Sequence, residues 1–123
     1  MIIEDAIRRY FDSWIAKDSS VIREVFADDI SYVESHGPVY EGKEQCIRWF
    51  EDWNRKGSVL VWDIKDIRSD DETFFVEWHF ECEYENSIDG FDGISVIEAG
   101  RDGRFRSIRE FQSQSRHYRP YGE

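Results

Sequence analysis

The sequence predicts a single α+β domain over residues 1–123, with three helices followed by an antiparallel sheet. Two observations lead to this prediction. Apolar residues recur with helical spacing up to about residue 56 and with the two-residue spacing of strands thereafter. A chain of 123 residues has the usual length of one domain, and this one contains no internal repeat or linker that would divide it.

The first two helices follow from helical spacing and from a capping signal. Apolar residues at the start of the chain share one helical face with charged residues between them, which predicts an amphipathic helix from residue 3 to about Lys17. Asp18 and Ser19 have the side-chain oxygens that favour the start of a helix, so a second, short helix is expected after them. Asp28 and Asp29 end that helix.

The next elements are a short strand and a third helix. We expect the strand over residues 30–34, before a turn-prone stretch at 35–38. The third helix is expected over about 43–56. Gly42 precedes it, and Gly57 supplies the residue type that commonly ends a helix.

The rest of the chain alternates as strands do. Strands are expected over residues 58–68, 73–85, 93–99 and 104–117, with a loop at 86–92. The clearest alternation lies in 73–85, where the even positions are apolar and aromatic and the odd positions carry four glutamates and His79. The even-numbered face of this strand is therefore expected to point inward.

The charge balance limits the partners that we expect. The formal net charge is −11, from 16 Lys and Arg against 27 Asp and Glu. An acidic chain repels phosphate backbones and anionic lipids, so neither nucleic acid nor a membrane is an expected partner. The first twenty residues lack the apolar core of a signal peptide, and a cytoplasmic protein is expected. Cys46 and Cys82 are then expected to be buried free thiols rather than a disulfide.

Generic motifs for catalysis or for cofactor binding are missing from the sequence. It contains no phosphate-binding loop, no G-x-G-x-x-G, no G-x-S-x-G, no H-E-x-x-H and no C-x-x-C. The three histidines, His36, His79 and His117, do not have the mutual spacing of metal ligands. We therefore expect neither a metal site nor a cofactor.

Four strings occur in the order and at the spacing of a known fold family. They are RYFDSWIAKD at 9–18, FADDISYVE at 26–34, GKEQCIRWF at 42–50 and FDGISVIEAGRDGRFRSIREF at 91–111. Together they resemble the nuclear transport factor 2-like (NTF2-like) superfamily, in its SnoaL-like and ketosteroid isomerase-like branch. The resemblance implies a cone in which three N-terminal helices pack on a curved antiparallel β-sheet around an open, mostly apolar pocket.

The resemblance also implies a homodimer that forms through the outer face of the sheet. By strand alternation, that face would carry Phe75, Phe105 and Phe111. An exposed apolar patch of this kind usually marks an interface.

The resemblance to ketosteroid isomerases implies three catalytic positions. Tyr10 falls where those enzymes have the tyrosine that binds the oxyanion, and Glu34 falls where they have the proton-shuttling aspartate. Ser95 occupies the place of their protonated aspartate and is a weaker hydrogen-bond donor. Local roles are the alternatives: Glu34 as a strand-end residue bonded to turn amides, and Tyr10 as a packing residue with its hydroxyl bonded in the core.

The same registers place further residues around the pocket. The expected ligand-binding residues are Trp14, His36, Trp49, Phe50, Val76, Trp78, Ile108, Glu110 and Gln112. Two of them leave alternatives open. Glu110 either faces the pocket or pairs with a nearby arginine, and His36 either forms an acid–base pair with Glu34 or turns away at Gly37.

The predicted function is that of a small-molecule pocket protein. One hypothesis is a cofactor-free isomerase, hydratase or cyclase with Glu34 as the base, because aromatic walls raise the pKa of a carboxyl toward neutrality. With acids inside, the pocket is too polar for a steroid. The alternatives are non-catalytic binding or sensing of a small apolar or amphipathic ligand, and a dimeric scaffold whose core is filled. A cavity well below the ~300 Å³ of usual ligand sites would favour the scaffold.

Overall fold

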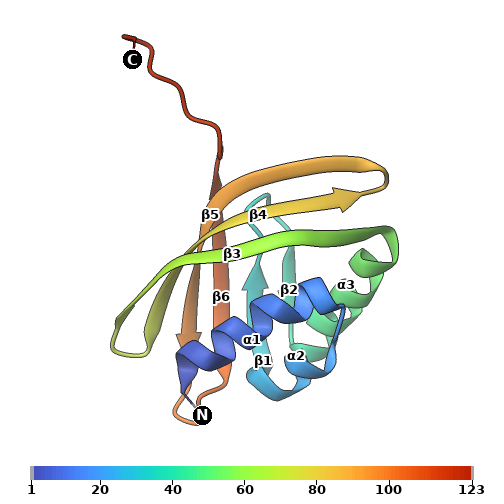
Figure 1. The fold of residues 1–123 in the computed structure, drawn as a ribbon. Helices are drawn as coiled ribbons and strands as arrows, with labels where there is room; N and C mark the ends of the chain where they lie inside the picture. Colours follow the sequence, from blue (N-terminus) through green and yellow to red (C-terminus); the bar gives the residue numbers. More distant parts are fainter. Residues whose placement is uncertain (1, 123) are drawn as a thin grey trace.

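The computed structural model describes residues 2–122, in which three helices pack against a six-stranded sheet (Figure 1). The helices are α1 (Ile3–Ala16), α2 (Ser20–Val25) and α3 (Lys43–Lys56). The strands are β1 (Phe26–Val33), β2 (Val39–Glu41), β3 (Gly57–Asp70), β4 (Thr73–Tyr84), β5 (Ser87–Ala99) and β6 (Phe105–Ser113). This is the predicted α+β architecture, with three helices ahead of the long strands.

The sheet is mixed, and its strand order is β2-β1-β6-β5-β4-β3. Strands β3 to β6 form the expected antiparallel meander, and β1 runs parallel to β6. The expectation of a fully antiparallel sheet is therefore wrong at this one pairing. The chain leaves β1 and β2, crosses through α3 to the far edge at β3, and returns strand by strand until β6 reaches β1. The long strands β3 to β5 curve strongly in Figure 1.

Several boundaries differ from the sequence prediction. Strand β1 begins at Phe26 rather than at residue 30, because Phe26 pairs with Phe105 in the sheet. Strand β2 was not predicted, since three residues are too few to show a period. The C-terminal strand ends at Ser113, and the following residues extend away from the body (Figure 1).

The expected loop at 86–92 is also wrong, because β5 runs through it from Ser87. The turn is confined to Glu85 and Asn86, whose φ values of 49° and 69° are left-handed. Gly90 pairs with Glu81 within the ladder. Cross-strand pairing with the whole of β4 outweighs the low strand propensity of Gly, Asp and Asn in this stretch.

The core lies between α1 and the inner face of the sheet. Phe11 stacks on Trp62 with 3.9 Å between ring centroids. The predicted alternation of β4 is confirmed, because Val76, Trp78 and Cys82 are buried while the glutamates between them lie on the other face.

The outer face carries two of the three predicted phenylalanines. Phe75 and Phe111 are 38% and 51% exposed, whereas Phe105 is fully buried. The alternation fails at Phe105 because the register of β6 against β5 shifts at a bulge, so that Ala99 opposes Phe105 and Glu98 opposes Ser107. The homodimer stays a prediction.

Both cysteines, Cys46 and Cys82, are free and buried, as predicted. Within residues 2–122, no helix combines the length and the apolar character that a bilayer crossing requires. The cytoplasmic location stays a prediction.

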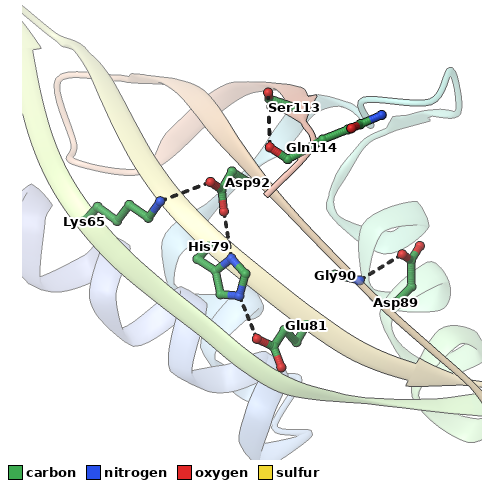
Figure 2. A network of polar contacts seen from close by, with 8 residues as sticks. All are labelled: Lys65, His79, Glu81, Asp89, Gly90, Asp92, Ser113 and Gln114. Atoms are coloured by element: carbon green, nitrogen blue, oxygen red, sulfur yellow. Dashed lines mark hydrogen bonds and ion pairs between the residues drawn. The ribbon is translucent and has the colours of Figure 1, made fainter. Parts of the chain in front are cut away.

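A polar network lies on the outer face and joins three strands (Figure 2). His79 of β4 contacts Asp92 through Nδ1 and Glu81 through Nε2, both at 2.7 Å. Lys65 of β3 donates to Asp92 at 3.2 Å. Asp63 lies opposite His79 in the register of β3 and adds a further negative charge nearby. Both ring nitrogens of His79 are thus engaged, which fits a structural clamp better than a catalytic base.

This clamp makes stability depend on pH. The hydrogen bonds with Glu81 and Asp92 raise the pKa of His79 above its ordinary value of 6.5. Its stabilisation is therefore fully present below pH 6.5 and is lost as the pH rises through the higher folded-state pKa. We expect the difference in urea-unfolding free energy between wild type and His79→Gln to be about 1 kcal/mol or less at pH 6 and smaller at pH 8. The variant His117→Gln serves as the control, and an equal difference at both pH values would contradict the assignment.

Candidate functional site

A cavity of ≈360 Å³ lies between the helices and the inner face of the sheet. It is lined by Trp14, Tyr32, Glu34, Ser35, His36, Trp49, Trp53, Val59, Trp62, Trp78, Phe80, Cys82, Tyr84, Asp89, Phe91, Glu110 and Gln112. The volume is within the range of small-molecule sites. A cavity of this size argues against the hypothesis of a dimeric scaffold whose core is filled by side chains.

Nine of the lining residues are aromatic, and six different elements supply them. Trp14 comes from α1, Trp49 and Trp53 from α3, and the others from β1, β3, β4 and β5. Their rings contact one another, as in the pair Trp14 and Trp49 with 4.9 Å between centroids. The exposed residues His36, Asp89 and Gln112 form the rim. The cavity is thus apolar at its base and polar at its mouth.

Glu110 is the carboxyl group at the centre of the buried polar contacts. Tyr32 Oη donates to Glu110 Oε2 at 2.7 Å, and Ser95 Oγ donates to the same oxygen at 3.2 Å. Each donor is supported in turn. Tyr10 Oη donates to Tyr32 Oη at 3.1 Å, and Trp78 Nε1 donates to Ser95 Oγ at 2.9 Å. Two chains of hydrogen bonds therefore converge on one oxygen of Glu110.

Burial raises the pKa of Glu110 and of both tyrosines in this network. Burial raises the pKa of Glu110 to about 7, the Tyr32 hydrogen bond opposes the shift, and the negative charge of Glu34 adds to it. Burial also raises the pKa of Tyr10 and of Tyr32 well above the ordinary value of 10.0. Both tyrosines therefore stay protonated as donors while Glu110 changes its charge near neutral pH.

Glu34 is the second carboxyl group of the cavity. Tyr40 Oη donates to its Oε1 at 2.7 Å, and His36 Nδ1 lies 3.9 Å from its Oε2. Burial raises the pKa of Glu34, and the Tyr40 hydrogen bond opposes that rise. Strand β1 ends at Val33, so His36 does not continue it, but it still lies beside Glu34 at the rim.

Most of the residues predicted for the site are brought together. Those that line the cavity are Trp14, Glu34, His36, Trp49, Trp78, Glu110 and Gln112. Of the two alternatives for Glu110, the structure has the side chain facing the cavity. Within residues 2–122 it forms no ion pair with an arginine, and its partners are Tyr32 and Ser95. Gln112 accepts a hydrogen bond from Ser35 Oγ at 2.7 Å across the rim.

Five predicted residues do not line the cavity. They are Tyr10, Phe50, Val76, Ser95 and Ile108, all at most 1% exposed. They point inward as expected, but they lie deeper, beneath the aromatic wall. Tyr10 and Ser95 are one hydrogen bond away from the site, at Tyr32 and at Glu110.

The sequence prediction missed several lining residues. Tyr32 precedes Glu34 by two positions within the strand predicted over residues 30–34, so alternation alone could have placed both on one face. Asp89 and Phe91 were missed because their segment was expected to be a loop. Trp62 had no signal that distinguished it from a core residue. Across the described chain, no cluster of three His, Cys, Asp or Glu residues is placed to hold a metal ion.

Solved structures share this fold at low sequence identity. A hypothetical protein from Catenulispora acidiphila, with a ketosteroid isomerase-like fold and in complex with trimethylamine, matches with a TM-score of 0.78 and 16% identity, over 89% of this chain and 86% of that one. An epoxide hydrolase from M. tuberculosis, described as LEH-like, matches with a TM-score of 0.80 and 16% identity, over 89% and 80%.

A third structure, from Mesorhizobium loti and named as a SnoaL-like polyketide cyclase, matches with a TM-score of 0.73 and 18% identity, over 90% of this chain and 99% of that one. At these identities the likeness shows the fold alone. No curated protein sequence matches the chain.

The family itself is shown by sequence. The model of the SnoaL-like domain matches residues 7–108, which include α1 from Ile7 onward, Glu34 with its neighbours, and β6 as far as Ile108. This match extends over most of the chain and agrees with the NTF2-like architecture of the structure. The chain therefore belongs to the SnoaL-like domain family.

Proposed function

We propose that this protein is a cofactor-free enzyme that moves a proton on a small molecule held in the aromatic cavity, with Glu110 as the acid–base group. The observation that supports the proposal is a carboxyl group with a pKa of about 7 that is fixed through one oxygen at the base of an aromatic cavity. General acid–base catalysis is most efficient when the pKa of the group lies near the working pH.

In this proposal the two oxygens of Glu110 have different tasks. Oε2 accepts the hydrogen bonds of Tyr32 and Ser95, and Oε1 accepts none within residues 2–122. The ionised carboxylate would remove a proton from a carbon next to a carbonyl through Oε1, and the neutral acid would return that proton to a second atom of the substrate. The aromatic wall excludes water from the reacting atoms.

The other polar residues would act through Glu110. Tyr10 and Ser95, expected to stabilise an oxyanion directly, become positioning residues, because their hydroxyl groups lie in the chains that hold Oε2. Glu34, expected to be the base, would instead set the acidity of Glu110, because its negative charge raises the pKa of that group. The bond from Tyr40 engages one oxygen of Glu34 itself.

Two further observations support a small-molecule site. The cavity volume of ≈360 Å³ suits a compound of modest size. The Catenulispora acidiphila protein of the same fold was solved in complex with trimethylamine, a small molecule. Non-catalytic binding is the second candidate, because nine aromatic side chains suffice to bury a ligand without any reaction.

The opening of 5-nitrobenzisoxazole separates the two candidates, because it requires only a base in an apolar cavity. The base takes the C3 proton, the C–H electron pair forms the nitrile, the N–O bond breaks, and the phenolate that leaves absorbs visible light. We expect the rate to exceed that of acetate at equal concentration by at least ~100-fold. We also expect it to rise with pH around a midpoint of about 7, because the ionised form of Glu110 is the active one. A rate equal to that of acetate would leave non-catalytic binding as the function.

A further inference from the structure

The charges that line the cavity are unbalanced. Among the described residues that line it, Glu34, Asp89 and Glu110 carry carboxyl groups and none is a lysine or an arginine. Within residues 2–122, the one basic side chain within 4 Å of either Glu34 or Glu110 is the exposed His36, whose Nδ1 lies 3.9 Å from Glu34 Oε2. Lys56 lines an adjoining hollow that shares Glu34 with the cavity, and it does not line the cavity itself.

Two neighbouring carboxylates without a cation are costly to bury. A desolvated carboxylate requires an opposite charge or takes up a proton instead. The two acids follow the second course, because burial raises the pKa of both and the charge of Glu34 raises that of Glu110 further. A positively charged ligand would supply the missing charge and allow both acids to ionise.

The walls favour a particular kind of cation. Tryptophan has the aromatic face that attracts an ammonium group most strongly, and five tryptophans line the cavity: Trp14, Trp49, Trp53, Trp62 and Trp78. An alkylated ammonium group also buries its methyl or methylene groups against such faces. Asp89 at the mouth and the net charge of −11 would draw cations toward the entrance.

We propose that the ligand of this cavity is a small organic cation, an alkylammonium compound whose charge lies between the carboxyl groups of Glu34 and Glu110 and against the tryptophan wall. This inference rests on the proposed function, because it names the class of substrate for the same cavity. Binding of the cation does not require Glu110 to react, so the two proposals can fail separately.

A pair of ligands with the same shape tests the inference. Choline carries a trimethylammonium group, and 3,3-dimethylbutan-1-ol replaces its nitrogen with carbon and has no charge. By calorimetry at pH 8, we expect choline to bind at least ~10-fold more tightly than the alcohol. At pH 7 its binding should release protons, because the cation lowers the pKa of Glu110, and the measured heat should then change with the ionisation enthalpy of the buffer.

A matched pair of variants locates the charge. Glu34→Gln should weaken the binding of choline by at least ~10-fold and leave that of the alcohol unchanged, whereas Glu98→Gln, on the exposed face of β5, should change neither. Equal affinities for choline and the alcohol, no binding of either, or an equal loss of both in Glu34→Gln would overturn the inference. Choline binding without opening of 5-nitrobenzisoxazole would keep the cation site and remove the proposed reaction.

Discussion

The variant Glu110→Gln is expected to open 5-nitrobenzisoxazole at least ~100-fold more slowly than the wild type. An amide has nearly the shape of the carboxyl group and can still accept the hydrogen bonds of Tyr32 and Ser95, but it cannot take up a proton. The measurement is the initial rate at pH 8, where the wild-type carboxyl group, with its pKa of about 7, is mostly ionised.

Two further variants make this result specific. Glu98→Gln, exposed on β5, should keep the wild-type rate. Glu34→Gln should remain active and move the midpoint of the pH profile below that of the wild type, because the negative charge of Glu34 no longer raises the pKa of Glu110. If Glu34→Gln were inactive and Glu110→Gln retained its rate, Glu34 would be the base, as the sequence prediction has it.

Loss of folding is a separate explanation that urea unfolding can measure. Removing a buried carboxyl group that lacks a cationic partner is expected to leave the free energy of unfolding of Glu110→Gln equal to that of the wild type or higher. A slow variant with wild-type stability would therefore have lost the base and not the fold.

Periodicity predicted those elements whose residues contact the core along their whole length. The third helix was predicted with its observed bounds, and β4 alternates along its length as expected. The errors lie where pairing between distant segments decides the structure. Strand β5 extends through Gly90 because β4 is there to pair with it, and Phe105 turns inward because of a bulge against β5. Neither contact leaves a local signal in the sequence.

The sequence predicts which residues point toward the site better than it predicts how close to the cavity their side chains lie. Alternation indicates whether a side chain points inward, and it placed Glu110 and Trp78 on the inner face. It does not indicate how far from the cavity that side chain ends. Tyr10 and Ser95, which the resemblance places in the catalytic site, consequently lie behind the aromatic wall. Each contacts the cavity through one hydrogen bond, to Tyr32 and to Glu110 respectively. The acid that they support is Glu110, because strand pairing brings β6 between β1 and β5.

The variant Gly93→Ala is expected to lower the free energy of unfolding by at least ~2 kcal/mol, within the range of overpacked cores. Gly93 of β5 lies opposite Trp78 in the register, and the indole ring occupies the space that a Cβ at Gly93 would take. An added Cβ would overlap Cη2 of Trp78 and lie 2.7 Å from its Cζ2 and 2.5 Å from the carbonyl oxygen of Phe111. The ring is packed against other aromatic side chains and the carbonyl belongs to the neighbouring strand, so neither can move freely.

Gly93→Ala should also lower the rate of the proposed reaction, because it displaces the ring of Trp78. Trp78 forms part of the cavity wall and donates to Ser95, which donates to Glu110. The rate with 5-nitrobenzisoxazole should therefore fall in Gly93→Ala even at temperatures where the variant is fully folded. Gly90→Ala is the matched control on the same strand. Its Cβ would lie 3.1 Å from the flexible side chain of Glu81 and 3.2 Å from the carbonyl oxygen of Phe80, with no contact below 3.0 Å, so a smaller loss than in Gly93→Ala is expected.

A double-variant cycle tests the physical cause. Trp78→Phe removes the two ring atoms that Cβ would meet, so the cost of Gly93→Ala should be smaller in that background than in the wild type. The remaining cost belongs to the carbonyl of Phe111, which the smaller ring does not relieve. If Gly93→Ala lowered the free energy of unfolding equally in the wild type and in Trp78→Phe, the contact with the carbonyl of Phe111 alone would require glycine at position 93. The packing of Trp78 over β5 would then not be a reason for glycine there.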